Sequence, residues 1–184
     1  LVIIITTNVT FIIFSTLSIF ISYAFAIIYW KDLNRLKNKS ISHQWFKAAV
    51  FFNAFSSLGA FALAIMMVAK IIHQNWYLAA EYFYLHFQYN GWFFFSCMGL
   101  VTAQLFQSAP ILILKRIYLL FAFAVIPAYF LSALWMNIPV WVYILVIIAA
   151  FAQVAGWIYM AGLIKNQNAI FKSPFSVTAK WLLG

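Results

Sequence analysis

Charged residues and cysteines are scarce in this 184-residue chain, and their scarcity excludes several classes of protein. Only 7% of the residues are charged and 67% are hydrophobic, and a soluble domain of this size does not need so much apolar surface. A single cysteine, Cys97, cannot form an intrachain disulfide. The sequence also lacks a phosphate-binding glycine-rich loop, a His/Glu metalloprotease pair and a Ser/His/Asp set, so nothing in it indicates an ATPase or a hydrolase.

Long apolar runs dominate the rest of the sequence. Several exceed the ~20 residues that a helix needs to cross a bilayer, and the alternating ~10-residue segments of a membrane barrel are absent. We therefore predict an all-α, polytopic transmembrane helix bundle that forms one domain over residues 1–184. The predicted spans cover about residues 2–30, 46–72, 80–106, 117–136 and 140–164. Because the chain starts without Met inside one apolar run and stops where another begins, we expect a fragment of a longer protein.

The basic residues predict the orientation of these five spans. The net charge is +9, but the basic residues lie in short connections between spans, which argues against nucleic acid as a partner. Every Lys and Arg except Lys70 falls on one side of the predicted membrane. The positive-inside rule then places the N-terminus outside and the C-terminus inside. The partners we expect are the lipid bilayer and either other membrane subunits or missing helices of the same chain.

The third predicted span contains the densest group of polar residues, His86, Gln88 and Asn90. Polar side chains are costly in hydrocarbon and usually face a partner, a cofactor or a cavity. A helix that starts at Ala80 places His86 roughly 9 Å below that residue, in the outer third of the bilayer. At 100° per residue, His86 and Gln88 point to opposite flanks, so this span should be central in the bundle. One predicted stripe contains His86, Asn90, Cys97 and Gln104, and the other contains Glu81, Tyr84 and Gln88.

Two interpretations of these polar residues stay open. In the first, they form hydrogen bonds across helices that contribute under about 1–2 kcal/mol each. Partners for such bonds would be Asn53, Ser56, Ser57 and Gln153. In the second, His86 binds a haem iron or another metal through its neutral imidazole, with His73 as a conceivable second ligand. Glu81 would pair with Lys70 or His73, carry protons to a site, or remain a solvated carboxylate. The residues expected to support His86 or to line a cavity are Gln88, Asn90, Glu81, Tyr84 and His73.

The string His86-Phe87-Gln88-Tyr89 resembles the His-Phe-His-Tyr pattern in the tenth helix of haem–copper oxidase subunit I. In both, the motif lies near the outer end of an inward-running helix that two further spans follow. The resemblance implies that the five spans correspond to helices eight to twelve of that family. It also implies that His86 is the axial ligand of the high-spin haem. Gln88 stands where the family has the ligand of the low-spin haem, and an amide is a poor haem ligand.

This resemblance favours one of three candidate functions. It implies an oxidoreductase-like subunit of haem–copper oxidase type for respiratory electron transport, divergent and with fewer cofactors, in a bacterial inner membrane or an equivalent energy-coupling membrane. Haem would be its cofactor. The second candidate is a small-solute transporter or channel, in which polar groups of the third span, Asn53 and Gln153 line a path. The third is a non-catalytic structural subunit of a membrane complex. Whether the chain is an enzyme stays open between these candidates.

Overall fold

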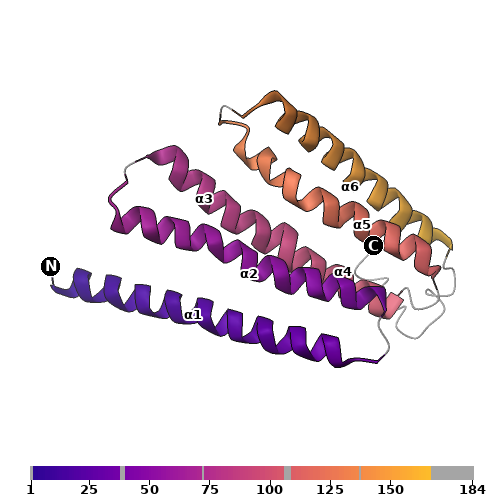
Figure 1. Ribbon diagram of the computed structural model, residues 1–184, viewed down its shortest axis with the longest axis horizontal. Coiled ribbons are helices and arrows are strands. Elements are labelled where there is room, and N and C mark those ends of the chain that lie inside the picture. The colour runs from indigo at the N-terminus through magenta and orange to yellow at the C-terminus, as the bar shows by residue number, and fades with distance from the viewer. Residues whose placement is uncertain (1, 38–39, 72, 106–108, 137, 167–184) are drawn as a thin grey trace.

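The computed structural model describes residues 2–37, 40–71, 73–105, 109–136 and 138–166, and all regular elements in this part of the chain are helices (Figure 1). The elements are α1 (Val2–Arg35), α2 (Ile41–Val68), α3 (Gln74–His86), the π-helical segment η1 (Phe87–Phe93), α4 (Phe94–Leu105), α5 (Ile111–Ala128), the 3₁₀ segment η2 (Tyr129–Ala133) and α6 (Val140–Asn166). The predicted all-α fold is confirmed. The predicted direction of insertion stays a prediction. Three of the basic residues on which it rests lie outside the described residues, namely Lys39, Lys172 and Lys180.

Helix length and composition identify an integral membrane protein. Four helical stretches in the described part of the chain are long and apolar enough to cross a bilayer: Thr16–Arg35, Ile41–Val68, Ile111–Ala133 and Val140–Lys165. The third predicted span is represented by α3, η1 and α4. The backbone stays right-handed helical at both junctions, so these three elements form one continuous rod from Gln74 to Leu105. We call this element the central rod.

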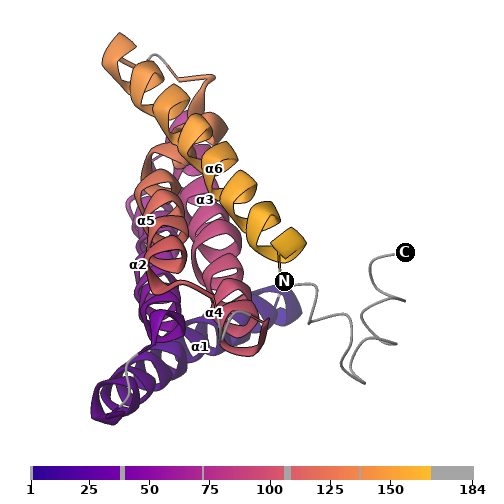
Figure 2. The same ribbon diagram turned by 90° about the vertical axis from the view of Figure 1, so that its right-hand side faces the viewer.

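The central rod lies in the middle of the bundle, as predicted. It packs against α2 on one side and against α5 and η2 on the other (Figure 1). At the two edges, α1 packs on α2 and α6 packs on α5. Figure 1 shows α1 at the edge away from α6, and Figure 2 shows that it crosses the other helices at an angle. Large apolar side chains fill the core where α2, the rod and α5 meet. The largest fully buried apolar side chains there are Trp45, Phe87 and Phe95, and Phe52 and Phe121 pack beside them.

Glycines set how closely α2 and the central rod approach. A Cβ atom built on Gly59 of α2 would lie 2.5 Å from the carbonyl oxygen of Ala80 and 2.8 Å from the amide nitrogen of Tyr84. On the rod, a Cβ atom at Gly91 would lie 2.6 Å from the Cβ of Phe52. Only a residue without a side chain fits such contacts, so the two helices meet through their backbones.

The helices are longer than the apolar runs predicted. α1 continues to Arg35, α2 begins at Ile41, and α3 begins at Gln74 rather than Ala80. An apolar count stops at charged and interfacial residues, but Lys, Arg and Gln are good helix formers and their long side chains reach water from a helix end. The helix that carries His86 thus begins six residues before Ala80. His86 is roughly 18 Å from the start of the rod, and its position in the outer third of the bilayer stays a prediction.

Candidate functional site

His86, the last residue of α3, is buried at 7% exposure with both ring nitrogens in hydrogen bonds. Its Nε2 lies 2.8 Å from the carbonyl oxygen of Val125 on α5, and its Nδ1 lies 3.3 Å from Nδ2 of Asn90. A carbonyl oxygen can only accept, so Nε2 carries the proton and donates it. Nδ1 of the neutral ring then accepts from the Asn90 amide. No imidazole nitrogen is left for another partner.

Pro127 explains why Val125 offers a carbonyl to another helix. In a regular α-helix, that carbonyl would accept the N–H of Tyr129. Beyond Pro127, however, α5 tightens into the 3₁₀ segment η2, and the Tyr129 N–H bonds to the oxygen of Ile126 instead. The Val125 oxygen is therefore relieved of its usual donor and accepts from His86.

Aromatic rings hold the His86 imidazole in place. The ring of Phe87 is 5.1 Å from it in an edge-on arrangement, and the ring of Tyr129 is 6.0 Å away. The Tyr129 hydroxyl donates to the carbonyl oxygen of Ala79 at 2.9 Å, which ties η2 to α3. His86 thus lies in a packed joint between the central rod and the α5–η2 helix.

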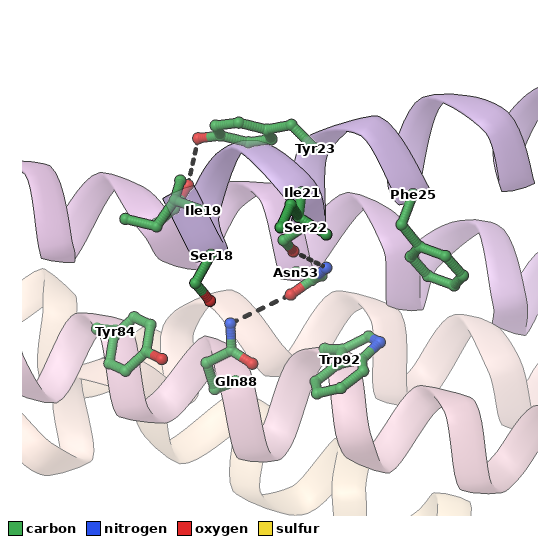
Figure 3. Close-up of a pocket in the computed structure, with 11 residues that line it drawn as sticks. Ser18, Ile19, Ile21, Ser22, Tyr23, Phe25, Asn53, Tyr84, Gln88 and Trp92 are labelled. Carbon is green, nitrogen blue, oxygen red and sulfur yellow. Dashed lines mark hydrogen bonds between the residues drawn. The ribbon is translucent and has the colours of Figure 1, made fainter. Parts of the chain in front are cut away.

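Gln88 belongs to a separate chain of hydrogen bonds on the opposite flank of the rod, as predicted from its angular position. Its Nε2 donates to Oδ1 of Asn53 at 3.2 Å and to Oγ of Ser56 at 2.7 Å. Nδ2 of Asn53 donates in turn to Oγ of Ser22 on α1 at 2.8 Å (Figure 3). This chain links the rod, α2 and α1 through side chains that are buried or partly buried.

The π-helical segment η1 begins directly after His86 and changes the angular register of the rod. Its hydrogen bonds run from residue i to i+5 and widen the turn, so the regular 100° step no longer holds. His86 and Asn90 still meet, and the extension of their stripe to Cys97 and Gln104 stays a prediction. Asn90, Cys97 and Gln104 are all exposed. π segments inside α-helices are frequent at functional sites.

Two of the pockets beside the rod are lined by residues from the predicted polar set. A pocket of about 460 Å³ lies between α1, α2 and the rod and is lined by Asn53, Tyr84 and Gln88, among others (Figure 3). A pocket of about 200 Å³ lies on the other side and is lined by Asn90 and Gln153 together with aromatic rings. The predicted cavity-lining residues are therefore divided between two separate pockets. His86 lines neither of them.

The structure does not bring the remaining candidates to His86. His73 is exposed just before α3, roughly 20 Å from His86 along the helix axis, so these two side chains cannot share a ligand in this arrangement. Glu81 is exposed and lies outside the pocket that Tyr84 and Gln88 share. Among the described residues, no ion pair joins Glu81 to Lys70 or His73.

The arrangement around His86 does not fit a haem ligand. Ligation needs one imidazole nitrogen that is free to face the iron, and both nitrogens of His86 already have partners inside the bundle. Within residues 2–37, 40–71, 73–105, 109–136 and 138–166, no cluster of three or more His, Cys, Asp or Glu could hold a metal ion. A haem on His86 would require the ring to give up the Val125 oxygen.

The chain matches no protein-family model, no curated protein and no solved structure. The likeness of His86–Tyr89 to the oxidase motif therefore still rests on those four residues and on helix order. The contacts of the site are the main basis for a functional conclusion.

Proposed function

We propose that this chain is a non-catalytic helical subunit of a larger membrane complex, in which His86 joins helices instead of binding haem. The observation that carries the proposal is the pair of hydrogen bonds from His86 to Val125 and Asn90. Under this proposal, the chain still resembles the C-terminal helices of haem–copper oxidase subunit I in the order of its helices. It differs from that family in binding fewer cofactors. On that resemblance alone, we place it in an energy-coupling membrane such as a bacterial inner membrane.

Two polar links support this structural role. One runs from α5 through His86 to the rod, and the other runs from the rod through Gln88 and Asn53 to Ser22 of α1. Each interhelical bond in a membrane contributes about 0.6–2 kcal/mol, and breaking one leaves a buried polar group without its partner. Together they hold four helices in one rotational setting, which a scaffold subunit needs and which requires no reaction chemistry.

The separation of the polar residues into different pockets argues against a channel. Asn53 and Gln153 line different pockets on opposite sides of the rod. The buried rings of Phe87 and Phe95 fill the bundle core in which the rod lies. Within the described residues, these polar groups therefore do not line one shared path across the bundle.

A haem-binding redox subunit is the second candidate, and one observation favours it specifically. The motif that resembles the oxidase pattern coincides with the start of η1, and π segments often mark functional positions. In this alternative, the His86 ring turns away from Val125 and presents Nε2 to the iron, and the haem supplies the redox chemistry. The remaining residues of the site would only position the imidazole.

A reduced-minus-oxidised absorption spectrum with a pyridine haemochrome assay separates the two candidates. The full chain is purified in detergent from haem-replete cells, next to His86→Ala and the exposed control His73→Ala. We expect no stoichiometric haem in any of the three proteins. We also expect His86→Ala to lower the free energy of unfolding by about 1–3 kcal/mol, with His73→Ala within about 0.5 kcal/mol of the parent. Stoichiometric haem that disappears in His86→Ala would overturn the proposal in favour of the second candidate.

A further inference from the structure

The pocket between α1, α2 and the central rod lies near the midpoints of these three helices. Its polar walls come from Ser18, Asn53 and Gln88, and each of these residues is near the midpoint of its own helix. Of these three helices, α1 packs on α2 and α2 packs on the rod. Because each is at least as long as the ~20 residues that cross a bilayer, their midpoints fall in the hydrocarbon region rather than at its surface.

Several polar groups of this pocket have no hydrogen-bond partner among the described residues. The Tyr23 hydroxyl bonds to Ser57, and both polar atoms of the Asn53 amide are used, one toward Ser22 and one toward Gln88. In contrast, no hydrogen bond reaches the hydroxyls of Ser18 and Tyr84 or Oε1 of Gln88 from any described residue. The unpartnered groups are thus two hydroxyls and one amide oxygen.

These groups belong to residues that line the same pocket. In Figure 3, the Ser18 side chain and the Tyr84 hydroxyl both point toward Gln88, from α1 and from the rod respectively, and the Gln88 amide oxygen lies on the side facing Trp92. In the hydrocarbon region, water is not at hand to satisfy such groups, so leaving them without partners costs free energy. A molecule that offers a hydrogen-bond donor and an acceptor there would remove this cost.

The rest of the pocket wall defines what else the molecule must be. Among the described residues that line the pocket there is no Lys, Arg, Asp, Glu or His, so none of them would compensate a charge. Its remaining walls are apolar and include Ile19, Phe25 and Trp92. Phe25 is 51% exposed and Trp92 is 38% exposed, so the rim faces the lipid and the pocket is open to entry from the bilayer. The volume of about 460 Å³ is within the usual range for small-molecule sites.

We propose that this pocket binds an uncharged, lipid-soluble molecule through a hydroxyl head group. The hydroxyl donates to Oε1 of Gln88 and accepts from the hydroxyl of Ser18 or Tyr84. The apolar body of the molecule lies against Phe25 and Trp92 and extends toward the lipid. This chemistry belongs both to a neutral lipid such as diacylglycerol and to a free lipid-soluble alcohol. The site does not include His86, so it stands whether or not the chain carries haem.

Photolabelling of the full chain in phosphatidylcholine nanodiscs tests this site. The probe is an octanol that carries a diazirine, and the labelled residues are mapped by mass spectrometry. We expect saturable labelling at the pocket that unlabelled octanol displaces. A double variant, Ser18→Ala with Tyr84→Phe, should lower labelling by about tenfold, because neither residue can then donate a hydrogen bond to the head group. These hydroxyls have no partner in the bundle, so the variant should fold like the parent.

Two controls sharpen the outcome. Tyr89→Phe removes an exposed hydroxyl outside the pocket and should leave labelling unchanged. A diazirine octane without a hydroxyl should label lipid-facing residues without saturation. Displacement of the probe by diacylglycerol assigns the site to a neutral lipid, and displacement by small alcohols alone assigns it to a free alcohol. Labelling that does not saturate, or that is equal in the parent and the double variant, would overturn the proposal.

Discussion

Replacing Gly59 by alanine should destabilise the bundle, although alanine is the better helix former. Helix propensity alone would favour the change by about 1 kcal/mol. In the folded protein, the new methyl group would lie 2.5 Å from the Ala80 oxygen and 2.8 Å from the Tyr84 nitrogen. Both are backbone atoms, which cannot rotate aside. Overpacking costs about 1–3 kcal/mol, and a backbone clash belongs at the upper end, so we expect a net loss of about 1–2 kcal/mol.

A matched control comes from Gly162 in α6, where an added Cβ would meet no atom within 4 Å. Gly162→Ala should therefore show only the gain in propensity, up to about 1 kcal/mol. The assay is unfolding of the full chain in mixed micelles by titration with sodium dodecyl sulfate, followed by tryptophan fluorescence. Gly59→Ala should unfold at a lower detergent fraction than the parent, and Gly162→Ala should not. Equal midpoints for the two variants would refute the backbone contact between α2 and the rod.

Two further predictions concern the polar network and the orientation. A double-mutant cycle on Gln88→Leu and Asn53→Leu, measured by the same titration, should give a coupling energy of about 0.6–1.7 kcal/mol, and a coupling of zero would contradict the hydrogen bond. In a Cys97→Ser background, a membrane-impermeant maleimide added outside should label Asn75→Cys but not Lys37→Cys, and the reverse pattern would show that the bundle inserts the other way.

The sequence was enough to predict that the chain forms helices, but not where each helix begins and ends. Apolar runs identified the helices because a bilayer leaves few other ways to satisfy the backbone. They underestimated α1, α2 and the rod because charged and interfacial residues continue a helix beyond the hydrocarbon. The change from α-helix to π-helix after His86 also escaped prediction. No residue type marks a π segment, so the regular angular step of 100° was assumed through Phe87–Phe93, where the turn is wider.

The candidate site could be predicted only in part. Polar residues in an apolar span drew attention to His86 and Gln88, and their opposite directions followed from helix geometry. The partner of His86 was missed because it is a backbone oxygen, which every residue has. The one available signal was Pro127, which predicts a disturbed helix and thus a carbonyl near it without its usual donor. Gly59 was also overlooked, because a lone glycine does not show which backbone it will face.

By itself, the sequence determined that this protein is a set of apolar helices in a membrane, and its charge pattern predicts their direction of insertion. Those properties depend on residues that are close together along the chain. Only the tertiary structure decided which polar groups meet, because Ser22, Asn53 and Gln88 come from three helices and are paired by the rotation of each one. The same rotations place Ser18 and Tyr84 in the wall of a pocket and give both nitrogens of His86 hydrogen-bond partners. The candidate binding site of this protein is therefore the pocket beside Gln88 rather than the His86 imidazole.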